Sequence, residues 1–270
     1  MSSSTTLPES IKQVIIHTGN ILSLNGIIGK PSQNASEELV ESIKITLNDG
    51  NNLENSLEKF VEVMRKNDDL LQKMSGVDRK DLKIGAKLFL NNENADAVNQ
   101  ALLNIFQALK TETIDNLIVS YNDIKTDNEE SSSSFVLNKI KSIWNILENY
   151  TKENATNRII HLGVADLDEE QFRDLYAWAT VKPNIIQINL ASCCVVPPTL
   201  QEFCNQNSIQ LLTHSDPTEI LPVSSIQNLF GDKNALKLFW AIRFQIHIKC
   251  RGVLTSKGYI VNLCDNILEE

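Results

Sequence analysis

The chain has 270 residues, of which 42% are apolar and 22% are charged, so it can form one large domain or two small ones around a sizeable core. Its net charge of −9 argues against nucleic acid or an anionic membrane as the main partner, because phosphate binding needs concentrated lysine and arginine. No apolar run approaches the roughly 20 residues of a membrane span, and the amino-terminal residues lack the basic flank and apolar stretch of a secretory signal.

The chain begins with small polar residues, and residues 1–10 are predicted to form a disordered tail ahead of a domain that spans residues 11–270. In the first half of that domain, hydrophobic periodicity predicts both strands and helices. Strands are expected at residues 14–17, 83–89 and 116–121, and helices at residues 36–47 and 94–109. Ser36 is the expected N-cap of the first helix. The apolar residues between 53 and 64 also follow helical spacing.

Residues 122–134 are polar and acidic and form the clearest loop candidate. Beyond this segment the alternation of strands and helices continues. Strands are expected at residues 158–164, 185–190 and 210–213, and helices at residues 135–150, from Asp168 and from Pro197. Asp168 and Gln171 have the spacing of a capping box, and two consecutive prolines fit the first turn of a helix.

The alternation of strands and helices from residue 83 onward is typical of a parallel sheet, either open or closed into a barrel. Residues 252–254 complete the series of strands, but the second strand of an eight-fold barrel is not found. Residues 242–248 alternate apolar and polar side chains and predict an additional strand. Such a strand or hairpin would leave an edge that another chain can pair with.

The five cysteines are odd in number and sparse, which favours a reducing cytoplasm over a secreted disulfide scaffold. Cys193 and Cys194 are adjacent and follow a predicted strand. Two interpretations stay open, a redox-active pair and small apolar side chains that pack in the core. The four histidines are scattered, and no spacing resembles a zinc or iron site, so no metal is expected.

The most distinctive sequence segments lie between residues 161 and 217, where HLGVADLDEEQFRDLYAWATV precedes NLASCCVVPP and IQLLTHSDP. Four further segments follow the order of the family named next: IIHTGN, SEELVESIKITLN, AKLF and RGVLTSKGYI. On these segments the chain resembles the regulatory, or modifier, subunits of glutamate–cysteine ligase, a family that in turn resembles the aldo-keto reductases. The resemblance implies an α/β fold, a (β/α)8-type barrel of aldo-keto reductase type whose second strand is irregular or missing.

The resemblance also implies what the chain does. It implies a non-catalytic subunit that forms a heterodimer with the catalytic subunit of glutamate–cysteine ligase, improves the use of glutamate and ATP, and relieves feedback inhibition by glutathione. No cofactor is expected, although NADPH binding stays open. The alternative is an NADPH-dependent aldo-keto reductase whose proton donor has moved to Tyr121, or a subunit that senses NADPH without turning it over.

Aldo-keto reductases use a tyrosine as general acid, assisted by an aspartate, a lysine and a histidine. By the resemblance, Lys87 matches the lysine and Ser120 stands where the histidine is usual. No tyrosine precedes Lys87, so the reductase tetrad is expected to be lost and no residue of this chain is expected to be catalytic.

A vestigial reductase and nucleotide pocket is therefore expected, and its residues are Lys87, Ser120, Asp166, Gln187, His214 and Ser256. Asp166 replaces an asparagine of the family and cannot donate as an amide does, and His214 replaces the aromatic residue that stacks on nicotinamide. Plainer interpretations stand beside these: Lys87 as a lysine at a strand end, and Asp166 and Asp168 as residues of a helix amino terminus.

Overall fold

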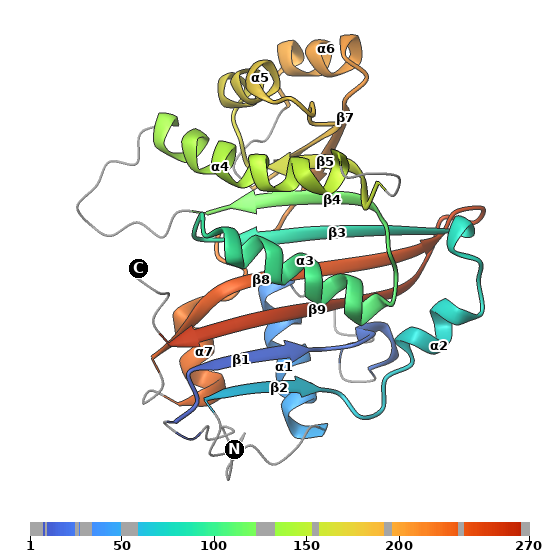
Figure 1. The fold of residues 1–270 in the computed structure, drawn as a ribbon, viewed down its shortest axis with the longest axis vertical. Helices are drawn as coiled ribbons and strands as arrows, with labels where there is room; N and C mark the ends of the chain where they lie inside the picture. The colour runs from blue at the N-terminus through green and yellow to red at the C-terminus, as the bar shows by residue number, and fades with distance from the viewer. Residues whose placement is uncertain are drawn as a thin grey trace. The chain divides into compact units, whose positions relative to one another are not determined.

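The structure is a computed structural model, and it describes residues 8, 10–24, 27, 34–49, 59–122, 133–152, 157–191, 196–231 and 235–265. The chain divides into two compact units. The terminal unit comprises residues 1–83 and 217–270, and the central unit comprises residues 84–216. Figure 1 shows the elements of both units, coloured along the chain.

The described residues of the terminal unit form four strands, in the order β2 (Phe60–Met64), β1 (Gln13–His17), β9 (Val253–Asp265) and β8 (Leu236–Ile248). β1 runs parallel to β2, while β9 runs antiparallel to both β1 and β8. Helix α1 (Ala35–Asp49) packs on β1, β2 and α7 (Val223–Phe230). Shorter helices complete the unit: η1 (Ile21–Ser23), α2 (Leu70–Ser75) and η3 (Arg79–Asp81).

The central unit is built from five parallel strands whose order in space is their order in the chain. They are β3 (Leu82–Leu90), β4 (Ile114–Tyr121), β5 (Ile159–Ala165), β6 (Ile185–Asn189) and β7 (Gln210–His214). The connections carry α3 (Ala95–Leu109), α4 (Ser133–Lys152), α5 (Glu169–Trp178) and α6 (Pro198–Gln206). Because all five strands run the same way, their carboxyl ends meet at one side of the sheet, where a ligand site is usually placed.

The predicted α/β fold is confirmed, and so are most of its predicted elements. The capping box of α5 is present, since Asp168 Oδ1 accepts from Gln171 N at 2.8 Å and Gln171 Oε1 accepts from Asp168 N at 3.1 Å. The N-cap prediction for α1 is wrong by two residues. Asn34 Oδ1, not the Ser36 hydroxyl, accepts from Glu37 N at 2.8 Å.

The helical interpretation of residues 53–64 is wrong for residues 60–64, which form β2. In β2, Val63 is buried, whereas Phe60 and Met64 are exposed apolar residues. Apolar side chains on both faces hide the two-residue period of a strand and imitate the spacing of a helix. β2 is the second strand in chain order, so the second strand that hydrophobic periodicity did not reveal is present.

The alternation at residues 242–248 does mark a strand, because it falls within β8, where Ile242, Phe244 and Ile246 are buried. The expectation that this strand or its hairpin leaves a free edge is wrong on the side of its hairpin partner, which starts near residues 252–254. These residues enter β9, which has β1 on one side and β8 on the other. The predicted tail and loop, residues 1–10 and 122–134, fall largely outside the described residues. In the ranges that are described, no helix is both long and apolar enough to cross a bilayer.

Candidate functional site

Five polar side chains gather at the carboxyl ends of the central unit's strands, and they are named here the polar cluster: Lys87, Ser120, Asp166, His214 and Asp216. Lys87 lies on β3 and Ser120 on β4, while Asp166 directly follows β5. His214 ends β7, and Asp216 lies two residues beyond. The parallel strands thus bring together residues that are far apart in the chain.

The ammonium group of Lys87 is the buried cation of the polar cluster, since this residue is only 4% exposed. Its Nζ donates to Asp216 Oδ2 at 2.8 Å and lies 3.3 Å from His214 Nδ1. A buried ammonium is costly unless a carboxylate compensates it, and Asp216, itself buried, does so. Lys87 is therefore not a solvated lysine at a strand end.

The imidazole of His214 lies between two carboxylates. Its Nδ1 accepts from the backbone N–H of Asp216 at 3.2 Å, and its Nε2 lies 2.9 Å from Asp166 Oδ1. Because Nδ1 accepts this hydrogen bond, the neutral ring carries its proton on Nε2, whose contact with Asp166 is close but lacks hydrogen-bond geometry. Burial lowers the pKa of His214, but the carboxylates of Asp166 and Asp216 outweigh it, so the pKa lies above its ordinary value of 6.5.

Asp166 supplies the more accessible carboxylate, with 31% of its side chain exposed. Its Oδ2 accepts from Ser120 Oγ at 2.7 Å, and its backbone has a φ of 65°, a left-handed conformation that is strained for a residue other than glycine. Burial raises the pKa of Asp166, but His214, Lys87 and Ser120 together lower it below the ordinary 3.8. Asp166 is therefore a carboxylate at neutral pH, and its contacts belong to the polar cluster rather than to the amino terminus of α5.

The remaining predicted pocket residues are Gln187 and Ser256. Gln187 pairs with Ala165 across β5 and β6, and its buried Oε1 has no hydrogen-bond partner among the described residues. Ser256 lies on β9 in the terminal unit, where it is fully buried. Its Oγ likewise has no partner within the described ranges. Cys193 and Cys194 lie outside the described residues.

Two residues of the site were missed from the sequence. Asp216 is the counterion of Lys87, and Asn189 Nδ2 donates to the backbone oxygen of Asp216 at 2.9 Å. The available signal was position, because both residues lie at or just beyond the carboxyl end of a predicted strand. When the His214 ring is protonated, the charges of the two carboxylates, the ammonium and the imidazolium balance in a largely buried ionic cluster.

The tyrosines of the central unit bind residues outside this cluster or face away from it. Tyr150 OH donates to Asn99 Oδ1 and Tyr176 OH lies 3.3 Å from Asn207 Oδ1. Tyr259, in the terminal unit, donates to Glu38 Oε1 at 2.6 Å. Tyr121 follows Ser120 on β4, and successive side chains of a strand point to opposite faces, so Tyr121 faces away from the polar cluster.

Binding of a nicotinamide dinucleotide at the polar cluster stays a prediction. Binding a carboxamide calls for a donor beside an acceptor, and Asp166, which stands in place of an amide, only accepts. The two ring nitrogens of His214 lie against the carboxylates of Asp166 and Asp216. In the described part of the chain, no three His, Cys, Asp or Glu residues come together as metal ligands.

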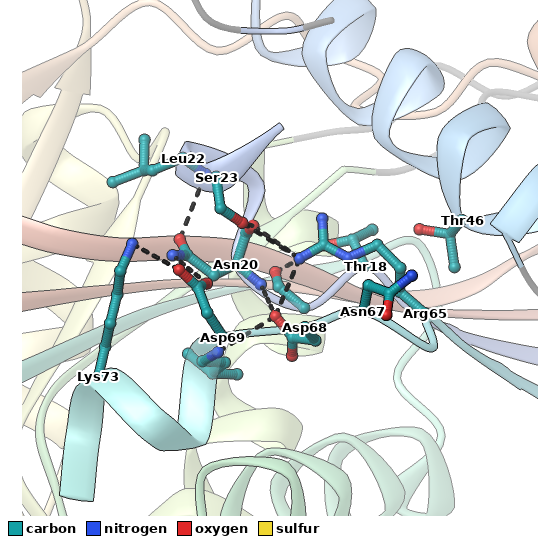
Figure 2. A network of polar contacts seen from close by, with 12 residues as sticks. Thr18, Asn20, Leu22, Ser23, Thr46, Arg65, Asn67, Asp68, Asp69 and Lys73 are labelled. Carbon is teal, nitrogen blue, oxygen red and sulfur yellow. Dashed lines mark hydrogen bonds and ion pairs between the residues drawn. The ribbon is translucent and has the colours of Figure 1, made fainter. Parts of the chain in front are cut away.

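A second polar group, named here the Asn20 network, lies in the terminal unit where the chain leaves β1 and β2, and Figure 2 shows it from close by. Arg65 directly follows β2 and is 7% exposed. Its Nη2 donates to Asn20 O at 3.0 Å, to Ser23 Oγ at 3.3 Å and to Asp68 Oδ1 at 3.0 Å. Asp68 Oδ1 also accepts from Asn20 N at 2.8 Å. These bonds fasten the loop after β1 to the loop after β2.

Gly19 shows why this network needs its local sequence. Gly19 has a φ of 62°, and a Cβ added there would lie 2.3 Å from Cγ of Asp68. The backbone conformation and the packing both require glycine. The groups of this network bind one another, so its evident role is to order the two loops.

Comparison with known proteins identifies the family. No family model matches the chain. The glutamate–cysteine ligase regulatory subunit of Homo sapiens is 32% identical over 256 residues, which cover 91% of this chain and 90% of that protein. The regulatory subunit of Rattus norvegicus is 33% identical over 261 residues, with the same shares. The aldose reductase of Giardia lamblia is similar in structure at a TM-score of 0.40 and 20% identity, over 52% of this chain and 48% of that one. Since both relatives exceed 30% identity along nine tenths of each chain, this chain belongs to the family of glutamate–cysteine ligase regulatory subunits.

Proposed function

We propose that this chain acts in the cytoplasm as the non-catalytic regulatory subunit of glutamate–cysteine ligase. It binds the catalytic subunit as a heterodimer, improves the use of glutamate and ATP, and relieves feedback inhibition by glutathione. The observation that carries the proposal is the similarity to named regulatory subunits along nine tenths of both chains, which leaves little of either sequence unmatched.

Regulation of this kind is a coupling free energy between the two subunits. The regulatory subunit must bind the glutamate-competent form of the catalytic subunit more tightly than the form that glutathione inhibits. A preference of about 1–3 kcal/mol is typical and changes an apparent affinity by roughly 5- to 150-fold. No chemistry by this chain is needed for that effect.

The polar cluster supports a role without catalysis. Reduction of a carbonyl needs an acid that protonates the developing alkoxide, and in the related reductases a phenol does so beside a lysine. Here Lys87 is bound to Asp216, and Tyr121, the candidate for a relocated donor, faces away from the cluster. The reductase alternative would require Tyr121 to cross to the other face of β4.

The experiment is to mix the purified chain with the catalytic subunit and to measure complex formation by size-exclusion chromatography. The KM for glutamate and for ATP and the inhibition constant of glutathione are then compared with and without this chain. We expect a complex of both chains, lower KM values and weaker inhibition. Failure to form a complex would contradict the proposal. Consumption of NADPH by the chain alone, with a panel of carbonyl compounds, would favour the reductase alternative.

A further inference from the structure

Basic side chains gather at one corner of the terminal unit, although the whole chain is acidic. This basic corner consists of Arg79, Lys80, Lys83, Lys249 and Arg251. The first three lie on η3 and at the start of β3, and the other two lie in the turn between β8 and β9. The backbone N–H of Lys249 donates to Asp81 O at 2.8 Å, so the two segments lie side by side.

The segments that form the basic corner carry more basic than acidic side chains. Four of its five basic side chains are exposed, and Arg79 is half-buried. The acidic residues in the same segments are Asp78 and Asp81. Lys80 Nζ lies 3.4 Å from Asp78 Oδ2, but both side chains are highly exposed, so this pair is weak. Burial and then the charge of Lys83 lower the pKa of the nearby His247, which agrees with a positive potential here.

The backbone holds these charges in place. The amides of Arg251 and Gly252 both donate to Ile248 O, at 3.3 and 2.8 Å, and Gly252 has a φ of 62° that suits this tight turn. Arg79 Nη1 donates to Leu82 O at 2.8 Å, which fixes the second segment. Val253, 50% exposed, adds an apolar contact surface beside the turn. An ordered surface loses little conformational entropy on binding.

We infer that the basic corner is a docking surface for an acidic segment of a partner protein. Resting on the proposed function, that partner is the catalytic subunit of the ligase. Charge complementarity selects the occupant: a net charge of −9 repels a long polyanion from most of this molecule, whereas a short acidic segment can meet the positive corner alone. Opposite charges at this place would speed association and fix the orientation of the two chains.

The test compares two double variants of the full-length chain that change the total charge equally. Lys249→Glu/Arg251→Glu reverses two of the five positive charges of the basic corner. Lys66→Glu/Lys237→Glu reverses two exposed lysines of the same unit, one of them at the opposite end of β8. Binding to the catalytic subunit is measured by surface plasmon resonance at low and at physiological salt. We expect the corner variant to bind roughly tenfold more weakly and with less salt dependence, and the control to stay within about twofold of wild type.

Further measurements separate the outcomes. If Lys249→Glu/Arg251→Glu does not fold, Lys249→Gln/Arg251→Gln removes the two charges without reversing them. This variant is also expected to bind more weakly than the control. If wild type does not bind the catalytic subunit, the proposed function fails, and binding of an oligo-glutamate peptide then tests the basic corner by itself. Equal affinity of both double variants would overturn the inference. So would loss of binding to RNA or to anionic lipid vesicles by the corner variant while its affinity for the catalytic subunit is unchanged.

Discussion

Lys87 and Asp216 are 129 positions apart in the chain, yet Nζ of the first lies 2.8 Å from Oδ2 of the second. Lys87 is on β3, and Asp216 lies just beyond β7, so this ion pair joins the first and last strands of the central unit. Five strands laid flat would separate β3 from β7 by roughly 19 Å, at about 4.8 Å per strand. The sheet must therefore curve strongly at its carboxyl end, as a barrel wall does.

Breaking this ion pair from either side should be costly. Lys87→Met leaves Asp216 without its cation, and Asp216→Asn leaves a buried ammonium without its carboxylate. Each change should lower the free energy of unfolding by about 3–5 kcal/mol. The double variant contains neither charge, so its loss should be smaller than the sum of the single losses by about 2 kcal/mol or more. Urea unfolding of the four proteins at neutral pH measures this cycle, and additive losses would show that the two groups do not depend on each other.

The pKa of His214 predicts how the stability of the polar cluster changes with pH. This pKa is raised in the folded state, so the protonated ring stabilises the fold. That contribution is fully present below about pH 6.5, the ordinary value for histidine, and is lost as the pH rises through the folded-state pKa. The difference in the free energy of unfolding between wild type and His214→Gln should therefore shrink as the pH rises above about 6.5.

The other histidines provide an internal control for this prediction. Burial lowers the pKa of His17 and also that of His247, so both should titrate below 6.5. Proton NMR titration of the ring signals should show His214 as the last of these three to lose its proton. A His214 that titrates before His17 would contradict the arrangement of carboxylates around it.

The alternation of strands and helices made the α/β class predictable, because each element of the central unit has a clear period and a clear boundary. Asn94 illustrates this: it precedes the apolar stripe of α3, and its Oδ1 accepts from Asp96 N at 2.8 Å. β2 escaped prediction because Phe60 and Met64 are apolar yet exposed, so the pattern of side chains does not reveal which face is buried.

The candidate site was predictable only in part, for a different physical reason. Ser120, Asp166 and His214 stand at strand ends, and Lys87 lies three residues before the end of β3. Parallel strands bring such positions together whatever their distance in the chain. Asp216 was missed because its importance comes from its contacts with Lys87 and His214, and the contact with Lys87 depends on the curvature of the sheet. Hydrophobic periodicity identifies strands but carries no information about how far a sheet curves.

Gly163 on β5 should be intolerant of a side chain. A Cβ added there would lie 2.6 Å from Cβ of Ile185 and 2.9 Å from its backbone oxygen, on the neighbouring strand β6. Gly163→Ala should therefore lower the free energy of unfolding by about 1–3 kcal/mol, the usual cost of overpacking. Gly76→Ala is the matched control, since the nearest atom to its Cβ would be Lys73 O at 4.0 Å and its backbone is right-handed. The control should be neutral or slightly stabilising, and equal losses for the two variants would contradict the close approach of β5 and β6.

Arg65 in the Asn20 network should be replaceable by lysine, although arginine and lysine are usually not interchangeable. The three acceptors that hold the guanidinium, Asn20 O, Ser23 Oγ and Asp68 Oδ1, all bind the single atom Nη2. The buried Nε and Nη1 have no hydrogen-bond partner within the described ranges, and an unmade buried bond costs about 1–3 kcal/mol. A lysine ammonium offers three donors on one atom and leaves no such group unpaired.

We therefore expect the free energy of unfolding of Arg65→Lys to lie within about 1 kcal/mol of the wild-type value. The small loss reflects the lysine side chain, which is one bond shorter than that of arginine. Arg65→Met removes every donor and should cost about 2–3 kcal/mol, because the buried acceptors of the two loops lose their partner. Urea unfolding measures both changes, and hydrogen exchange at the Asn20 amide, which donates to Asp68, reports whether the loops stay joined. If Arg65→Lys were as damaging as Arg65→Met, the nitrogens Nε and Nη1 would have to contribute to the fold, which would contradict the single-atom account of this arginine.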